Sequence, residues 1–157
     1  DRRLARRVRA LQERANIILV DAAGWALSTT SAASVIMRWL DCIETNFHFQ
    51  SLFDFLASPF SVAMEDRTRF QELVGHFEES AVYDAGVVSD LTRYTNTIQR
   101  KKNNIDEHAG EGTSSAILEL LTNLSAAAQP WRGLVTAKEA MAEDYFNALH
   151  SSLSQLE

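Results

Sequence analysis

Apolar residues recur at intervals of three and four along most of this chain, which has only two prolines and six glycines in 157 residues. That spacing places apolar side chains on one side of a helix, whereas a strand needs alternation at every second residue. Few residues that break helices interrupt the pattern. We therefore predict an all-α fold, a single helical bundle of six or seven helices that forms one domain over residues 1–157.

The first helix is predicted over about residues 1–27, and it is rich in arginine. Its apolar residues follow a four-three spacing that leaves most of the arginines off the apolar seam. The seam consists of Leu4, Val8, Leu11, Ala15, Ile18, Ala22 and Trp25. The Arg-rich helix is thus predicted to have one apolar side and a cationic flank.

Five later helices are indicated by apolar stripes within residues 35–43, 70–77, 87–98, 117–124 and 141–156. Polar residues that can cap a helix suggest where these helices begin. We expect one start at the cluster of residues 29–31, one at Ser61, one at Thr113 or Ser114, and one at the capping box formed by Thr136 and Glu139.

Helix ends are predicted from glycines, prolines and basic residues. The stripe of residues 87–98 should end at the basic run of residues 100–102, before a loop through Gly110 and Gly112. The next helix should end at Pro130 and Gly133.

Residues of the predicted core come from each stripe. We expect burial of Trp39, Phe53, Phe70, Leu91, Leu120 and Leu149. Residues 47–60 also hold five of the eight phenylalanines, more than one face of a short helix can accommodate. This segment is either the centre of the bundle or partly an interface.

Charge is divided unevenly along the chain. Residues 1–14 carry six arginines and two acids, a net charge of +4, whereas residues 15–157 carry nine basic and nineteen acidic residues, a net charge of −10. Such asymmetry favours docking to an acidic or phosphate-bearing surface, which can belong to another copy of the chain. The predicted contact residues are Arg2, Arg3, Arg6, Arg7, Arg9 and Arg14, joined by Arg100, Lys101 and Lys102.

Three classes of partner fit these basic residues. A protein partner or self-association is favoured, because the rest of the chain is acidic and could receive the arginines of a second copy. A nucleic acid backbone is the alternative, since arginine binds phosphate with two hydrogen bonds. An anionic membrane fits least, because the apolar seam is narrow and its one aromatic residue lies beyond the Arg-rich part.

Residues that could carry catalysis are few. Glu44 and His48, and Glu72 and His76, are four positions apart, and two such pairs could chelate a metal ion from facing helices. The carboxylate sites of helical bundles use a different, three-residue spacing. Cys42 is expected to be a buried and inert thiol. With no phosphate-binding loop or hydrolase motif in the sequence, we expect no catalytic residue, no metal and no cofactor.

The function predicted from the sequence is a non-enzymatic interaction or assembly subunit that docks through its Arg-rich N-terminal helix. The alternative is a coat-type structural protein that binds a nucleic acid backbone. The longest apolar run is too short for a membrane span of roughly 20 residues. The single cysteine favours an intracellular location, while the Arg-rich start leaves import into an organelle open.

Overall fold

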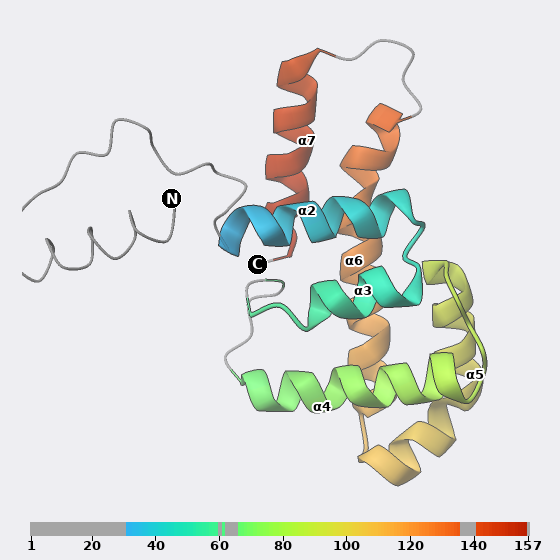
Figure 1. The fold of residues 1–157 in the computed structure, drawn as a ribbon. Coiled ribbons are helices and arrows are strands. Elements are labelled where there is room, and N and C mark those ends of the chain that lie inside the picture. The colour runs from blue at the N-terminus through green and yellow to red at the C-terminus, as the bar shows by residue number, and fades with distance from the viewer. Residues whose placement is uncertain (1–30, 60, 62–65, 136–140, 157) are drawn as a thin grey trace, which may run out of the picture. The chain divides into compact units, whose positions relative to one another are not determined.

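The computed structural model describes residues 31–59, 61, 66–135 and 141–156 (Figure 1). Six α-helices and one π-helical turn make up this part of the chain. They are α2 (Ser31–Glu44), α3 (Phe49–Leu56), α4 (Arg67–Glu78), the π-helical turn η2 (Glu79–Tyr83), α5 (Leu91–Ala109), α6 (Thr113–Val135) and α7 (Ala142–Ser154). The described residues contain no β-strand, so the predicted all-α class is confirmed.

Helix α6 is the central element of the fold. Helices α2 and α4 pack across it, α3 lies between α2 and α4 and contacts both, and α7 runs beside the second half of α6 (Figure 1). Helix α5 packs on α6 as well as on α4 and η2. The described residues from Ser31 onward form one compact unit. The Arg-rich helix predicted over residues 1–27 lies outside the described residues, so a single domain over residues 1–157 stays a prediction.

The core is built from the stripes that the sequence indicates. Trp39, Phe70, Leu91 and Leu120 are buried as predicted, and Phe53 is half-buried and packs against the same cluster. Phenylalanines of the aromatic segment contribute strongly: Phe47 and Phe55 both contact Trp39, with ring centroids 5.9 and 5.1 Å from its ring. In the described residues, this segment therefore belongs largely to the centre of the bundle.

Helix α4 begins at Arg67 rather than at Ser61. The carboxylate of Asp66 accepts a hydrogen bond from the Arg69 amide at 3.0 Å, which satisfies one free amide of the first turn. Ser61 is buried instead, and its hydroxyl donates to the Ser58 carbonyl at 2.9 Å. Ser61 therefore stabilises the segment that follows α3.

Helix α5 also differs from the prediction at both ends. Val87 and Val88 precede it in a loop whose backbone pairs with the α2–α3 turn, through a hydrogen bond from the Phe49 amide to the Val88 carbonyl at 2.8 Å. The helix then continues through residues 100–104 and ends at Ala109. The prediction that the basic run marks the end of the helix was wrong. Side chains that precede the run and side chains that follow it pack in the fold or form hydrogen bonds there, so the helix continues through the run.

Helix α6 continues past Pro130, which the sequence predicted as its end. A proline removes one backbone donor from a helix and usually bends or ends it. Here the next turn packs against α7, where the rings of Trp131 and Tyr145 meet edge to face at 5.7 Å between centroids. Tertiary packing thus sustains the helix as far as Val135.

Helix α7 buries the predicted stripe only toward its C-terminal end, where Leu153 packs against the core and Leu156 is buried. Ala148 and Ser152 beside the stripe are also buried, whereas Met141 and Tyr145 are exposed and Leu149 is half-buried. The small side chains of Ala148 and Ser152 allow α7 to lie close to α6. The predicted capping box at Thr136 and Glu139 lies outside the described residues; within them, α7 begins at Ala142.

In the part of the chain that the structure describes, none of the helices combines the length and the apolar character needed to cross a membrane.

Candidate functional site

The residues predicted to contact a partner fall in two groups. Arg2, Arg3, Arg6, Arg7, Arg9 and Arg14 lie outside the described residues. The basic run of Arg100, Lys101 and Lys102 lies in the middle of α5, where consecutive side chains point about 100° apart. The three cations therefore do not form one compact patch.

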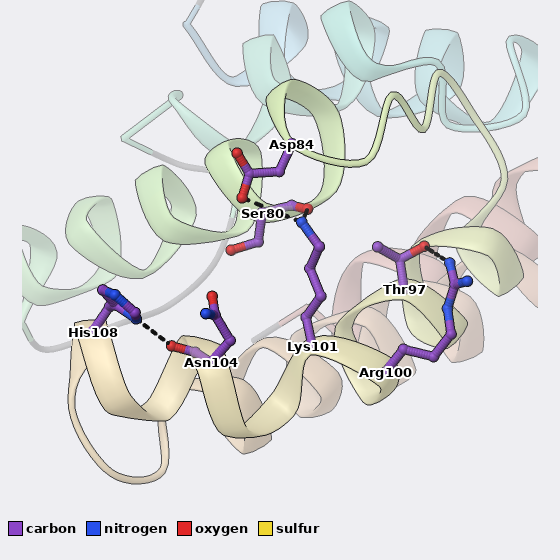
Figure 2. A network of polar contacts seen from close by, with 7 residues as sticks. All are labelled: Ser80, Asp84, Thr97, Arg100, Lys101, Asn104 and His108. Carbon is purple, nitrogen blue, oxygen red and sulfur yellow. Dashed lines mark hydrogen bonds and ion pairs between the residues drawn. The ribbon is translucent and has the colours of Figure 1, made fainter.

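Lys101 is directed toward the π-helical turn η2 (Figure 2). Its Nζ donates to the Ser80 carbonyl at 3.1 Å and forms an ion pair with the Asp84 carboxylate at 3.2 Å. The ion pair neutralises the charge of the lysine within the fold, and the two contacts together hold α5 to η2. Lys101 stays a predicted contact residue, but the structure gives it a local role.

Arg100 and Lys102 are the exposed members of the run. The guanidinium of Arg100 donates to the Thr97 hydroxyl at 3.3 Å, one turn back along the helix (Figure 2). Lys102 lies one turn before Asp106. The pKa of Asp106 is lowered mainly by the hydrogen bond that its carboxylate accepts from the Ser114 amide, and the positive charge of Lys102 lowers it further. Two cations of α5 are thus accessible to a partner.

The Glu44 and His48 pair does not share a helix face. Helix α2 ends at Glu44, and the chain turns through Asn46 and Phe47, both of which have positive φ angles. Glu72 and His76 do lie on one helix, α4. The described residues contain no group of three or more His, Cys, Asp or Glu placed to hold a metal ion.

A cleft of about 770 Å³ lies between α4 and the turn that joins α5 to α6. Glu72 and His76 line its α4 side, and Glu111 and Thr113 line the opposite side. This cleft could not be seen in the sequence, because its two sides are about 40 residues apart in the chain. Its lining carries both acidic and basic side chains, which suits a small polar molecule.

Cys42 is fully buried in α2, as predicted. Burial is the main cause that raises the pKa of its thiol to about 12, and the nearby Asp41 and Asp54 carboxylates raise it further. The thiol also lies 3.0 Å from the Ser51 carbonyl, to which it donates. A thiol held in its protonated form is a poor nucleophile near neutral pH.

Large apolar side chains are exposed at the start of α7, which the sequence did not indicate. Met141 and Phe146 are 77% and 72% exposed, and Tyr145 is 42% exposed. Burial on α7 begins only at Ala148, since residues 141–147 are all exposed.

Comparisons with protein-family models, with curated proteins and with solved structures found no significant match to this chain.

Proposed function

We propose that this protein is a non-enzymatic interaction or assembly subunit that docks through its Arg-rich N-terminal segment, residues 2–14. The observation that carries the proposal is the division of charge, +4 over residues 1–14 and −10 over the rest. The described residues agree with an acidic body, since they include fifteen Asp and Glu against eight Lys and Arg. Opposite charges of this kind steer association and fix its orientation.

The basic residues of the body are partly engaged inside the fold. Lys101 pairs with Asp84, and Arg67 donates to three backbone carbonyls at the end of α3 and just after it. Arg38 donates to the Asp54 carbonyl at 2.8 Å. These contacts leave the arginines of residues 2–14 as the largest group of cations close together in the sequence, which supports a docking role for that segment.

The test is to replace Arg2, Arg3, Arg6 and Arg7 together by Gln. A control replaces Arg69 and Arg93 by Gln, because these exposed residues of α4 and α5 are not among the predicted contact residues. It is compared with a variant in which only Arg2 and Arg3 are replaced by Gln, which changes the net charge equally. Association would be followed by light scattering in low salt and in about 1 M salt, where the screening length falls to about 3 Å. We expect the first variant to associate less than the parent, most clearly in low salt, and the control to match the parent.

A further variant, with Arg100 and Lys102 replaced by Gln, tests the nucleic acid alternative. A phosphate-binding protein should purify with bases that absorb in the ultraviolet and should lose about 0.7 to 0.9 from its salt slope for each phosphate contact removed. In that case this variant and the N-terminal variant would both flatten the salt dependence, because both remove predicted phosphate contacts. An N-terminal variant that associates as tightly as the parent at both salt concentrations would refute the proposed function.

A further inference from the structure

The cleft between α4 and the turn that joins α5 to α6 has the size of a small-molecule site. Its volume is about 770 Å³, and such sites occupy roughly 300 to 1,000 Å³. Phe70, Leu73 and Ala116 give the less exposed part of its lining an apolar character, whereas the charged side chains of the lining are more exposed. An apolar lining with a few polar groups around it is typical of a binding site.

The polar side chains that α4 contributes to the cleft lie on one face of that helix. Arg69, Glu72 and His76 are spaced by three and four residues, which places them one above another. Asp66 also lines the cleft, but its carboxylate already accepts a hydrogen bond from the Arg69 amide at 3.0 Å. The Arg69 guanidinium and the Glu72 carboxylate are therefore the charges that this wall offers to a ligand.

The opposite wall is a tight turn that hydrogen bonds hold in one conformation. The Asp106 carboxylate accepts hydrogen bonds from the amide and the hydroxyl of Ser114, and the Asp106 carbonyl accepts one from the Gly110 amide at 3.1 Å. Gly110 and Gly112 have φ angles of 103° and 90°, which residues with a Cβ rarely adopt. Glu111 thus lies on a turn whose shape is set before a ligand binds, which favours affinity.

Charges of both signs in the cleft are available to a ligand. In the part of the chain that the structure describes, the charged groups of Arg69, Glu72 and Glu111 form no ion pair and no hydrogen bond. A ligand with only one sign of charge would pair with one kind of group and would be repelled by the other. A ligand that carries both signs can pair with both kinds.

We propose that this cleft binds a small zwitterion with an ammonium group, a carboxylate and an apolar side chain, which is the chemistry of a free amino acid or a short peptide. The Arg69 guanidinium binds the carboxylate with two parallel hydrogen bonds. Glu72 and Glu111 accept hydrogen bonds from the ammonium group, and Leu73 contacts the apolar side chain. The inference does not depend on the proposed function, because it uses none of the predicted partner contacts.

The experiment titrates the full chain with four probes, up to about 10 mM, and follows the backbone amide signals by NMR. Two probes are zwitterions, free leucine and the dipeptide leucyl-leucine. Two carry one charge each, N-acetyl-leucine without the ammonium group and leucinamide without the carboxylate. We expect at least one zwitterion to shift the signals of His76, Gly110 and Gly112, and the single-charge probes to bind at least about tenfold more weakly. The better of the two zwitterions shows whether the ligand is an amino acid or a peptide.

Two variants each remove one half of the recognition. Arg69→Gln should bind the zwitterion at least about tenfold more weakly and no better than leucinamide, because the carboxylate has lost its partner. This variant keeps the cap of α4, which uses the Arg69 amide. Glu72→Gln combined with Glu111→Gln should remove the preference over N-acetyl-leucine. The matched controls are Arg93→Gln and Glu107→Gln, which are exposed on α5 outside the cleft and should bind like the parent.

Several results would overturn the inference. The first is that neither zwitterion shifts the signals of His76, Gly110 and Gly112, whether it binds elsewhere or not at all. The second is that a single-charge probe binds as tightly as the zwitterions. The third is that Arg69→Gln keeps the affinity of the parent while its amide spectrum shows an intact fold.

Discussion

The indole nitrogen of Trp39 donates a hydrogen bond to the hydroxyl of Ser152 at 2.7 Å, and thereby connects α2 to α7 across 113 residues of sequence. The same hydroxyl donates to the Ala127 carbonyl of α6 at 2.6 Å. Both side chains are fully buried. A single hydroxyl therefore links three helices in a region from which water is excluded.

Replacing Ser152 by Ala should lower the free energy of unfolding by about 1 to 3 kcal/mol, because the buried indole donor loses its partner. Urea unfolding would measure the loss, with Ser151→Ala as an exposed control that stays within about 0.5 kcal/mol. In a double-mutant cycle with Trp39→Phe, the effects of the two changes should not add. Full additivity would show that the hydrogen bond contributes nothing.

Asp106 should make stability depend on pH. Its carboxylate accepts hydrogen bonds from the Ser114 amide at 2.8 Å and from the Ser114 hydroxyl at 2.9 Å. The hydrogen bond from the amide contributes most to lowering the pKa of Asp106 from its ordinary value of 3.8. The ionised carboxylate is favoured in the folded state. It therefore stabilises the fold fully above about pH 4 and loses this effect as pH falls through the lowered pKa.

We expect the stability difference between the parent and Asp106→Asn to be largest near neutral pH and to shrink in acid. Urea unfolding at a series of pH values would follow it, with Glu107→Gln as the neighbouring control. A difference that stays constant from about pH 7 to about pH 3 would contradict the assignment.

Arg67 is predicted to act through its planar guanidinium rather than through charge alone. One of its nitrogens donates to the carbonyls of Leu56, Ala57 and Ser58, at the end of α3 and just after it. The guanidinium carbon also lies over the Phe70 ring, 5.2 Å from its centroid. Lysine can donate to carbonyls but has no planar group to lie over the ring, so Arg67→Lys should lower the free energy of unfolding by about 0.5 to 2 kcal/mol. The exposed Arg69→Lys is the matched control. Equal stabilities of the two variants in urea would count against this role.

Two phenylalanines should respond very differently to truncation. Phe77 is fully buried between Phe53 and Tyr94, so Phe77→Ala should cost about 3 to 5 kcal/mol of unfolding free energy. Phe146 is mostly exposed, and Phe146→Ala measured on dilute monomer should stay within about 0.5 kcal/mol. A large loss for Phe146 would show that α7 packs with its other side inward.

Cys42 should react slowly with thiol reagents in the folded protein. Its pKa of about 12 leaves almost no thiolate near pH 8, and its side chain has no access to solvent. We expect modification only as fast as the protein unfolds, followed by a rapid reaction once urea is added. Fast labelling of the native protein near neutral pH would show that α2 opens readily.

Helical periodicity was enough to predict the class of fold and most of the core, because burial of one helix side imposes that spacing. The boundaries were harder to predict. Asp66 and Asp90 cap α4 and α5 by accepting hydrogen bonds from the amides of Arg69 and Thr92. The sequence instead suggested that the first of these helices begins at Ser61, and it included Val87 in the apolar stripe of the second. Local sequence alone does not distinguish an apolar residue in a helix from one that packs from a loop.

The only part of the candidate site that the sequence could predict was the part that follows from the net charge of each segment of the chain. The N-terminal arginines stay a prediction. The ion pair of Lys101 could not be foreseen, since it depends on a π-helical turn about twenty residues earlier. The exposure of Met141 and Tyr145 was not predicted, because helical spacing alone does not show that α7 is packed only from Ala148 onward.

The central place of α6 has a consequence for the order in which the chain folds. Its most extensive neighbours, α5 and α7, are the helices directly before and after it in the sequence. Contacts between adjacent helices close short loops and form quickly, whereas joining α2 to α7 must close a loop of about 113 residues. We expect α5, α6 and α7 to assemble first in refolding, so that the environment of the Trp39 indole changes only in the last kinetic phase.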